Sequence, residues 1–592
     1  MTKSESGKKT SVKLMFLGGV GDDVTGSSTL VSIEIEGKNR YGLIDVGGYQ
    51  GASNRNAYFP VDATKIEFVV ITHAHYDHIG LLPKLYKDGF KGKVYITEQA
   101  KAQGKLILRD AANINVRNSE YTKCGGSKLK AEKRRYEKEK KKAVTCRDVK
   151  NYDVAISQLD DIIASVLYSL EDVSGLTPLY EVIKPNKLFT IFDGKVFGRF
   201  IPTTHQNGAI QFELYYKEND ERIGVLFTGD IGPDNSLLYE SKDGYINTEI
   251  EYGVVESLHG VEWPEETLED SISILEKLIN KSIRKGKTVV ISGFSLDRDA
   301  MLVYLINRMF AKGARFKAYF DAPLALSELI CYQNFYKQEY EKRMTSCDTD
   351  DLWFKDLGRD PFSLERFEVI TKIPEHTQLL NSSEPKVILT SSANGNGGRV
   401  VDFFDKLIQD SNTVFVFCGW IYPESPSSIL LNTEPGQIVD FGYSRYKKNC
   451  ETIQLHGFSS HGYWSEVLEK FFMYPAMREV ILNHGEWEVK EKLKKEIVET
   501  FEMGVHIPML YEAYEISKES IKPLVELDVN NFFGDVLEEY NMKCVLEEIE
   551  KEEEWKCKRE WRMSFPFSCI NMAIMVYYKS WDYIWKGYKW RY

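Results

Sequence analysis

Short apolar runs, separated by polar or glycine-rich turns, form the first part of the chain. They lie at 14–17, 30–35 and 41–46, and each has the length of one strand. Farther along, apolar runs alternate with segments of helical periodicity, as in the predicted strand 289–294 and the predicted helix 299–311. This alternation predicts an α/β protein, and 592 residues are too many for one ordinary core.

The apolar run 68–71 predicts a buried strand, and a polar cluster of three imidazoles and one carboxylate follows it. The cluster contains His73, His75, Asp77 and His78. A helix is predicted from Ile79 onward, so we expect the cluster on a strand-to-helix loop, where side chains can converge on one point. Imidazole nitrogen and carboxylate oxygen are ligands of zinc, and of manganese or iron under other conditions. The alternative is a polar loop whose histidines cap the helix, but four such donors rarely crowd together without an ion.

Further histidines and acids stand where other apolar runs end. They are Asp45, His205, Asp230, Glu256, His461 and His484. Taken singly, His205 could equally be an ordinary core or surface histidine, Asp230 a turn residue, and Asp45 a cap for the glycine turn after it. Together with the first cluster they supply the donors that a metal site would still need, and a carboxylate at a strand end can bridge two ions.

The spacing at 73–78 resembles the HxHxDH signature of the metallo-β-lactamase fold. The segments 254–260, 452–462 and 480–486 resemble motifs A, B and C of its β-CASP branch, whose members process nucleic acids. The resemblance implies a metallo-β-lactamase αββα sandwich with an inserted β-CASP α/β domain. It places the first part of the sandwich at 1–255, with a helical basic insertion at about 100–180, the β-CASP domain at 256–440 and the returning part of the sandwich at 441–516. A C-terminal extension of unknown role occupies 517–592.

The same resemblance implies a centre of two zinc ions. It assigns His73, His75 and His205 to one ion, Asp77, His78 and His484 to the other, and Asp230 to the bridge between them. It also implies that His461 is the general acid, that Glu256 orients or tunes it, and that Asp45 orients the histidine loop. The residues expected to act in catalysis are therefore His461, Glu256, Asp77 and Asp45.

RNA is the substrate that the resemblance implies, cut so that 5′-phosphate and 3′-hydroxyl ends result. DNA-processing relatives carry an apolar residue where this chain has His484, so His484 favours RNA. Contacts with RNA are expected from Arg298, Ser391, Ser392, Gly397 and Gly398, since small residues let the backbone approach phosphates. The chain departs from the family pattern at 258–259 and 394–396, which bears on these contacts more than on metal binding.

Three alternatives remain after this reasoning: a DNA nuclease of the same family, an inactive scaffold subunit of an RNA-processing complex, and a small-molecule hydrolase of the same fold. Glu256, His461 and the insertion at 256–440 disfavour the small-molecule hydrolase, because a small substrate needs no such cover. A complete set of ligands disfavours the scaffold. The pattern does not decide between endonucleolytic and 5′ to 3′ exonucleolytic cutting.

Charge and composition bear on nucleic-acid binding and on the cellular compartment. A net charge of −12 argues against a wholly basic nucleic-acid coat, while the basic run 128–142 predicts either a solvated helix or an arm that contacts phosphates. Nine cysteines without a CxxC pair fit a reducing compartment, and the first residues lack the apolar run of a signal peptide, so we expect a cytoplasmic protein.

The C-terminal part predicts no membrane contact. An acidic helical stretch at 547–554 precedes a tail with five tryptophans, and the apolar piece 563–578 is interrupted by Pro566 and Asn571, which disfavours a membrane span. The tail could be a dimerisation surface, a partner surface or a segment folded back on the body. Homodimer formation is therefore left open.

Overall fold

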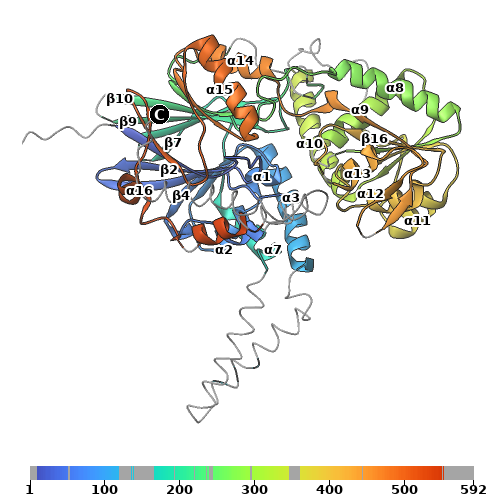
Figure 1. Cartoon of the computed structure of the whole chain (residues 1–592), viewed down its shortest axis with the longest axis horizontal. Coiled ribbons are helices and arrows are strands. Elements are labelled where there is room, and N and C mark those ends of the chain that lie inside the picture. The colour runs from blue at the N-terminus through green and yellow to red at the C-terminus, as the bar shows by residue number, and fades with distance from the viewer. Residues whose placement is uncertain are drawn as a thin grey trace, which may run out of the picture.

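Two lobes make up the described part of the chain (Figure 1). The computed structural model describes residues 10–551, apart from 51–53, 119–134, 136, 137, 139, 141–165, 193, 219–220, 235, 239–244, 294–296, 346–359, 424, 443, 540 and 550. Most of the basic run 128–142 and all of the tryptophan-rich tail lie outside the described residues. One lobe contains two large sheets, and the other contains a single six-stranded sheet with a small hairpin.

The first lobe is built on an eight-stranded and a seven-stranded sheet. The larger sheet has the order β23-β22-β1-β2-β3-β4-β5-β6. Its strands are β1 (Ser11–Gly18), β2 (Ser28–Ile35), β3 (Lys38–Ile44), β4 (Ile66–Val70), β5 (Lys93–Ile96), β6 (Tyr180–Val182), β22 (Ala513–Ser517) and β23 (Ile521–Pro523). The smaller sheet has the order β21-β20-β11-β10-β9-β8-β7. Its strands are β7 (Leu188–Phe192), β8 (Val196–Pro202), β9 (Ile210–Glu218), β10 (Glu221–Phe227), β11 (Tyr252–Glu256), β20 (Glu479–Asn483) and β21 (Gly504–His506).

These two sheets pack face to face through apolar side chains. Phe16 of β1 and Phe68 of β4 belong to the same buried cluster as Phe212 of β9 and Val225 of β10. β-branched and aromatic residues suit such an interface because they pack well on a pleated surface. Helices cover the outer face of each sheet. They are α1 (Tyr76–Ile79), α2 (Leu82–Lys87), α3 (Glu98–Asn118) and α7 (Leu170–Gly175) on the larger sheet, and α14 (Trp464–Met473) and α15 (Trp487–Phe501) on the smaller, with α16 (Glu526–Phe533) near the C-terminal end. The layer order is helix, sheet, sheet, helix, which confirms the predicted sandwich.

The second lobe is a parallel sheet between two layers of helices. Its order is β14-β13-β15-β12-β16-β19, with β12 (Thr288–Ser292), β13 (Lys317–Asp321), β14 (Phe367–Val369), β15 (Lys386–Thr390), β16 (Thr413–Cys418) and β19 (Glu451–Leu455). Helices α8 (Leu268–Arg284), α9 (Arg298–Ala311) and α10 (Pro323–Thr345) cover one face, and α11 (Ile373–Asn381), α12 (Val400–Leu407) and α13 (Pro426–Asn432) cover the other. The hairpin is formed by β17 (Ile438–Asp440) and β18 (Arg445–Lys447). Central strands buried on both faces explain the apolar runs without alternation.

The chain leaves the first lobe after β11 and returns after β19. Strand β20 pairs in parallel with β11, and β22 pairs with β1, so the last part of the chain completes both sheets of the first lobe. Strand β19 falls inside the returning part predicted at 441–516, yet it pairs with β16 of the second lobe. The return therefore comes after Leu455, because this run adds a sixth parallel strand beside β16.

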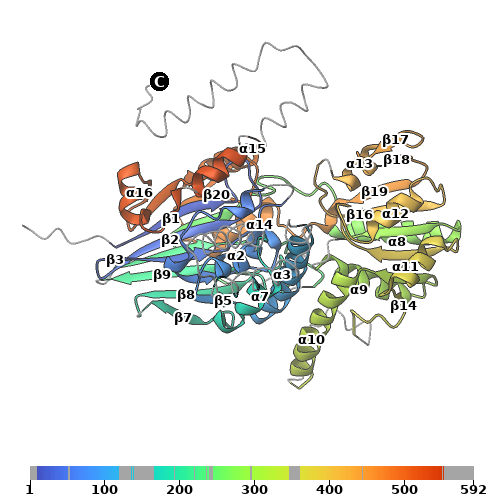
Figure 2. The ribbon, with the colours of Figure 1, turned by 90° about the horizontal axis from the view of Figure 1, so that it is seen from below.

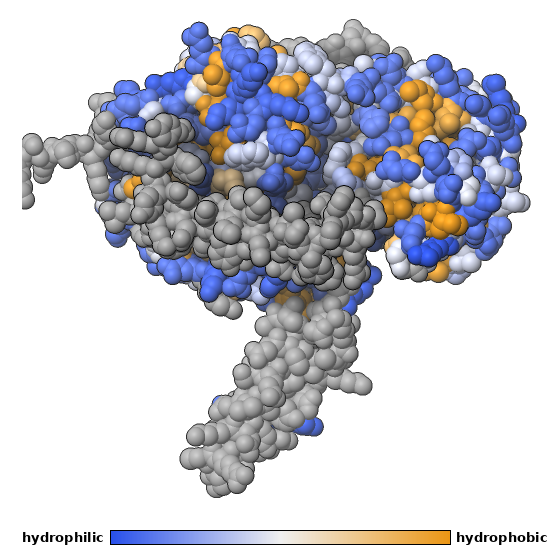
Figure 3. Space-filling model, in the orientation of Figure 1, coloured by the Kyte–Doolittle hydropathy of each residue, from blue (hydrophilic) through white to orange (hydrophobic). Residues whose placement is uncertain are grey.

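The lobes touch through their helices. α10 of the second lobe lies in contact with α3 of the first (Figure 2). On the face drawn in Figure 3, polar side chains predominate and apolar ones form smaller areas on both lobes. Within the described ranges, no helix combines the length and apolar character that crossing a bilayer requires.

Candidate metal centre and active site

Three of the candidate residues lie at one sheet edge because their strands run in parallel. β10, β11 and β20 are neighbours with the same direction, so their carboxyl ends meet at the same edge. Asp230 comes three residues after β10, Glu256 is the last residue of β11, and His484 directly follows β20. The sheet thus brings together residues that are up to 254 positions apart, by subtraction of 230 from 484.

The histidine cluster faces this edge from the end of β4. His73 and His75 precede α1, and Asp77 and His78 lie within α1, which begins at Tyr76. The prediction that the helix would begin near Ile79 was therefore wrong, because one turn is already closed by the amides of His78 and Ile79 donating to the carbonyl of His75 at 3.0 Å.

The glycine pair after Asp45 is explained by this helical turn. The Gly48 N–H donates to the Tyr76 carbonyl at 3.0 Å, and a Cβ at Gly47 would lie 1.8 Å from the carbonyl oxygen of Asp77. Only a residue without a side chain allows so close an approach. The pair therefore sets the position of α1 against β3.

Four donor atoms form a first group. One ligand atom each of His73, His75, His205 and Asp230 lie within 4.8 Å of one another. His75 Nδ1 is 3.0 Å from His73 Nε2 and 2.9 Å from His205 Nε2. Asp230 Oδ2 is 3.4 Å from each of these two Nε2 atoms.

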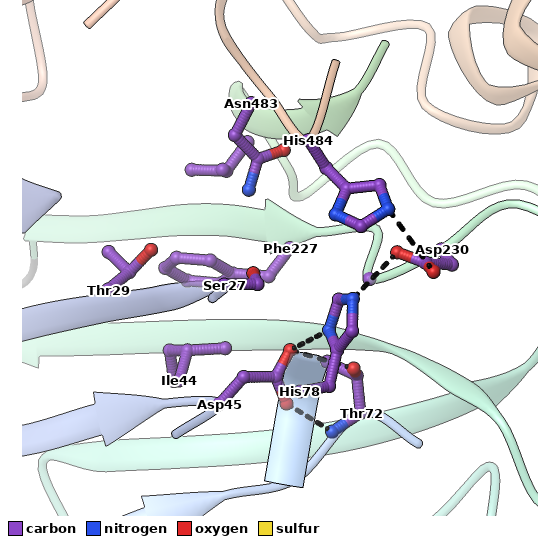
Figure 4. Close-up of a pocket in the computed structure, with 12 residues that line it drawn as sticks. Ser27, Thr29, Ile44, Asp45, Thr72, His78, Phe227, Asp230, Asn483 and His484 are labelled. Atoms are coloured by element: carbon purple, nitrogen blue, oxygen red, sulfur yellow. Dashed lines mark hydrogen bonds and ion pairs between the residues drawn. The ribbon is translucent and has the colours of Figure 1, made fainter. Parts of the chain in front are cut away.

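A second group lies on the other side of Asp230. Ligand atoms of Asp77, His78 and His484 are within 4.8 Å of one another. His78 Nε2 is 3.1 Å from Asp230 Oδ1, and His484 Nε2 is 3.6 Å from Asp230 Oδ2 (Figure 4). The seven residues thus form the same two sets, with Asp230 between them, that the family resemblance implies.

Hydrogen bonds at Nδ1 determine which nitrogen is protonated in His205 and His73. His205 Nδ1 donates to the carbonyl of Ser460 at 2.8 Å. His73 Nδ1 lies 3.1 Å from Thr72 Oγ1, whose own hydrogen is directed to Asp45 Oδ2 at 2.8 Å, so His73 Nδ1 is the donor of that contact. Burial also lowers the pKa of both imidazoles well below its usual value, which makes them neutral. Each ring therefore directs an unprotonated Nε2 into the site.

These lone pairs face one another without enough hydrogens. His75 Nδ1 can donate its single hydrogen to only one of the two Nε2 atoms, and Asp230 adds a further acceptor. On the other side, His78 Nε2 and Asp230 Oδ1 are both buried and lie 3.1 Å apart. A cation resolves the shortage of hydrogens in the first group, since it accepts lone pairs from all of its atoms. Imidazole nitrogen with carboxylate oxygen is a donor set that fits a metal ion.

Asp230 and His78 are the two residues of the cluster whose charged forms are favoured. Burial would raise the pKa of Asp230, but the surrounding histidines hold it well below its usual value. Burial alone would lower the pKa of His78, while the carboxylates of Asp230 and Asp45 hold it well above. Burial lowers the pKa of His75 to about 3 and that of His484 to about 4.

Asp45 holds the histidine cluster from behind. Its Oδ1 accepts from the Thr72 N–H at 2.8 Å, and its Oδ2 accepts from Thr72 Oγ1 and from His78 Nδ1, both at 2.8 Å. It is buried and has a positive φ of 59°. Asp45 therefore fixes the ring of His78 without facing the metal site, and Figure 4 shows it on the side of that ring away from Asp230.

His484 is positioned by the glycine-rich turn at the end of β1. Its φ is 49°, and its N–H donates to the carbonyl of Gly19 at 2.7 Å. The glycine-rich turn at 18–21 thus contacts the site through its backbone. No pattern of side chains in that turn could have indicated this role.

His461 and Glu256 form a pair beside the donor groups. His461 Nδ1 is 2.6 Å from Glu256 Oε1, and the second carboxylate oxygen accepts from the Ile231 N–H. Burial would lower the pKa of His461, but the charge of Glu256 raises it, while burial raises the pKa of Glu256 to about 7. The side chain of His461 is 19% exposed, against 0–3% for His73, His78, His205 and His484. With Nδ1 bonded to Glu256, His461 has Nε2 left to meet a substrate.

His259, one of the residues at which the chain departs from the family pattern, lies beside this pair. Its Nε2 is 3.1 Å from Ser459 Oγ, which accepts from the backbone N–H of His461 at 3.1 Å. Its ring stacks on Tyr463 with centroids 4.2 Å apart. The contact depends on residues 200 positions apart, so only its place next to motif A could have drawn attention to it.

The residues expected to contact RNA lie at the carboxyl edge of the six-stranded sheet. Ser391 and Ser392 follow β15, and Gly397 and Gly398 lie farther along the same loop, where Gly398 is exposed. Arg298 opens α9 and is buried, and the Nε atom of its guanidinium has no hydrogen-bond partner. Burial is the main cause of the lowered pKa of His75, and the charge of Arg298 makes a smaller contribution in the same direction.

Comparison with protein-family models supports the architecture. The chain matches the metallo-β-lactamase superfamily over residues 21–269, the β-CASP domain over residues 300–429, and the Zn-dependent metallo-hydrolase RNA specificity domain over residues 445–508. The chain belongs to the metallo-β-lactamase superfamily and carries a β-CASP domain. The family resemblance found in the sequence is thereby confirmed.

Curated relatives of this β-CASP protein are distant in sequence. It is 22% identical over 477 residues to "Ribonuclease TTHA0252" of Thermus thermophilus, covering 79% of this chain and 92% of that protein. It is 21% identical over 523 residues to "Transcription termination factor FttA" of Cenarchaeum symbiosum, with coverage of 86% and 71%. It is 23% identical over 551 residues to "Endoribonuclease YSH1" of Candida glabrata, with coverage of 89% and 63%.

Proposed function

We propose that this β-CASP protein is a two-zinc-dependent ribonuclease that hydrolyses RNA phosphodiester bonds and leaves 5′-phosphate and 3′-hydroxyl ends. One observation carries the proposal: six donor side chains from three parts of the chain, 73–78, His205 and His484, gather in two groups on either side of the Asp230 carboxylate. His73, His75 and His205 would hold one ion, Asp77, His78 and His484 the other, and Asp230 both. Three donors and a bridge for each ion leave room for water and substrate.

When bound, the pair of ions supplies Lewis acidity, which lowers the pKa of a water and offsets charge on the phosphate oxygens. His461 supplies the proton that the departing 3′-oxygen needs. Its Nδ1 is held by Glu256 at 2.6 Å, so the proton is delivered from Nε2. The raised pKa of His461 keeps that proton in place near neutral pH.

His461 is assigned to proton transfer and not to metal binding. One of its nitrogens lies within 4.8 Å of donor atoms of Asp230 and His484, so a ligand role has to be considered. The nitrogen near Asp230 is Nδ1, at 3.9 Å, and this atom is already bonded to Glu256. Its Nε2 and its greater exposure suit contact with substrate.

RNA is favoured over DNA by two observations. The third family model that the chain matches describes an RNA specificity domain, and two of the relatives above are named as ribonucleases. Arg298, Ser391, Ser392, Gly397 and Gly398 are proposed to contact its phosphates. The four free cysteines among the described residues fit a reducing cytoplasm, which is the proposed location; a homodimer is left as an expectation of the sequence.

The test uses 5′-labelled RNA and DNA of one sequence. We expect the zinc-loaded protein to cut the RNA, the mapped products to carry 5′-phosphate and 3′-hydroxyl ends, and His75→Ala to lose the activity. Faster cutting of the DNA would assign the protein to the DNA nucleases. Equal cutting by the parent and by His75→Ala would contradict a metal-dependent mechanism. A protein that binds zinc fully but cuts neither RNA nor DNA would instead be the inactive scaffold subunit.

A further inference from the structure

Two aromatic side chains lie exposed on one short turn of the second lobe. Trp420 is 56% exposed and Tyr422 is 52% exposed, and their ring centroids are 5.9 Å apart with an angle of 75° between the rings. Ile421 between them is buried in the core of this lobe. The turn therefore directs two rings outward while its middle residue fixes it to the sheet.

The turn stands at the carboxyl edge of the six-stranded sheet, whose strand β19 leads to His461. It follows β16, which lies between β12 and β19 in a parallel sheet, so the carboxyl ends of the three strands are neighbours at about 4.8 Å spacing. Arg298 comes after β12, and His461 comes six residues after β19. Ligands of such sheets bind outside the carboxyl ends of the strands. The strand that carries the two rings thus lies between the strands that lead to Arg298, a candidate phosphate contact, and to His461, the candidate general acid.

Three hydrogen bonds to the backbone of the turn hold it in place from both sides. The Gly419 N–H donates to the carbonyl of Leu455 at 2.9 Å, and the side-chain amide of Gln454 donates to the carbonyl of Gly419 at 2.9 Å. The Tyr422 N–H donates to Asn394 Oδ1 at 2.9 Å. Asn394 belongs to the glycine-rich loop that is expected to contact phosphates, and it is one of the residues at which this chain departs from the family pattern.

We propose that Trp420 and Tyr422 form a stacking platform for unpaired nucleobases of the RNA that enters the active site. The inference rests on the proposed function and specifies its substrate as single-stranded at this point. Every base has a flat face, so stacking on an aromatic ring is independent of sequence, and it requires a base that is not paired. Rings at 75° to each other cannot enclose one base between them, so each ring takes its own base.

The experiment measures binding, not cutting, so that the two proposals can fail separately. His461→Ala serves as the background, because it should bind RNA without cleaving it. The probes are a fluorescein-labelled 12-nucleotide unpaired RNA, the same RNA annealed to its complement, and the same strand with abasic sites in place of its internal bases. Fluorescence anisotropy gives Kd for each probe over a range of salt concentrations.

Trp420→Ala is expected to raise Kd for the unpaired RNA by about 5- to 150-fold, the effect of losing one stacked base. Kd for the abasic strand should not change, and the slope of log Kd against log salt should stay the same, because no phosphate contact is lost. Tyr422→Ala should act in the same direction. Trp420→Phe keeps a ring and should restore most of the affinity.

Phe472→Ala is the matched control. Phe472 is 68% exposed, so it removes an exposed ring of similar size, but it lies eight residues into α14, about 12 Å along the helix from Trp464. The Kd values of Phe472→Ala should equal those of the His461→Ala background. Unchanged binding by Trp420→Ala, or an equal loss on the abasic strand, would overturn the platform while leaving the ribonuclease intact. If neither the parent nor the His461→Ala background bound RNA, both proposals would be overturned. If Trp420→Ala lost self-association of the protein while its RNA binding stayed unchanged, the rings would be assigned to a protein contact instead.

Discussion

Asp45 and Asp230 are both buried carboxylates, yet their surroundings give them different roles. Asp45 accepts three hydrogen bonds from Thr72 and His78, which satisfy its oxygens. Asp230 lies within 4 Å of five imidazoles, and the unprotonated Nε2 atoms of His73 and His205 have no hydrogen to donate to its Oδ2. A buried carboxylate that faces other acceptors is costly unless a cation lies between them. Asp45 is therefore a positioning residue, and Asp230 is the residue prepared for metal.

Asp45→Asn tests the positioning role. Asparagine has the same shape and tolerates the positive φ of 59° at this position, but it has no charge to hold His78 Nδ1. We expect zinc affinity to fall by about 10- to 100-fold, the usual effect of removing a carboxylate behind a metal-bound histidine. Competition with a chromophoric chelator measures this affinity. Unchanged zinc affinity with unchanged thermal stability would show that Thr72 and the backbone hold the cluster without Asp45.

His461→Ala separates proton transfer from metal binding. The variant should lose about 10²- to 10⁴-fold in kcat on RNA, the usual contribution of a general acid, while its zinc content stays equal to that of the parent. A phosphodiester with a p-nitrophenolate leaving group needs no proton, so its hydrolysis should be nearly unaffected. Mass spectrometry of the bound metal and rates on the two substrates decide the matter. Loss of zinc in this variant would make His461 a ligand instead.

At the scale of elements, the strands could be predicted from their apolar runs and the first helical turn of the site could not. The run 68–71 corresponds to β4 (Ile66–Val70), and the helix expected at 299–311 corresponds to α9 (Arg298–Ala311). α1 begins three residues earlier than predicted, because its only turn is fixed by contacts with Gly47 and Gly48 and not by helix propensity.

The candidate site could be predicted only as far as the resemblance reached. The apolar runs predict that His205 and Asp230 follow strands. Their proximity to His73 depends on which strands pair, and the periodicity of the sequence does not determine strand order. The contacts of His259 could not be predicted for the same reason, since its partners Ser459 and Tyr463 follow the second lobe in the chain.

A pH-dependent contact is built where α15 meets the turn after β1. Lys490 Nζ is buried and donates to the carbonyl of Gly21 at 3.0 Å, and burial lowers its pKa to about 8 despite the nearby carboxylates of Asp22 and Asp23. Between this value and the ordinary pKa near 10.5, the unfolded chain binds more protons than the folded one. The contribution of Lys490 to the free energy of unfolding therefore becomes more favourable as pH rises through this window.

Lys490→Met removes the titrating group and keeps the length of the side chain. The difference in unfolding free energy, wild type minus variant, should rise by up to roughly 3 kcal/mol from pH 7.5 to 10.5, since each unit of pKa shift corresponds to about 1.4 kcal/mol. Urea unfolding at several pH values measures it, and taking the difference cancels the other groups that titrate in this range. A difference that stays flat or falls with pH would contradict the buried, shifted lysine.

At the scale of the whole molecule, the metal donors come from both sides of the second lobe. His73 and Asp230 precede the chain's excursion into the six-stranded sheet, and His484 follows its return. Two ions held by these donors, with Asp230 shared, would therefore link the early and late parts of the first lobe without any covalent bond between them. The second lobe contains none of the seven donors, and its sheet has its own two apolar layers.

Removal of the metal should for this reason loosen one lobe and spare the other. Without a cation, the lone pairs of His73, His75 and His205 face one another again, while full occupancy stabilises the folded state by about 4 kcal/mol per site when free zinc is 1,000 times Kd. After chelation, we expect hydrogen exchange to accelerate at 72–79, 229–231 and 483–486, and to stay unchanged in β12, β15 and β16. Readdition of zinc should restore the protection, whereas calcium should not, because imidazole is a poor ligand for it. Equal acceleration in both lobes would mean that the second lobe depends on the metal centre through α3 and α10, the helices in contact between the lobes.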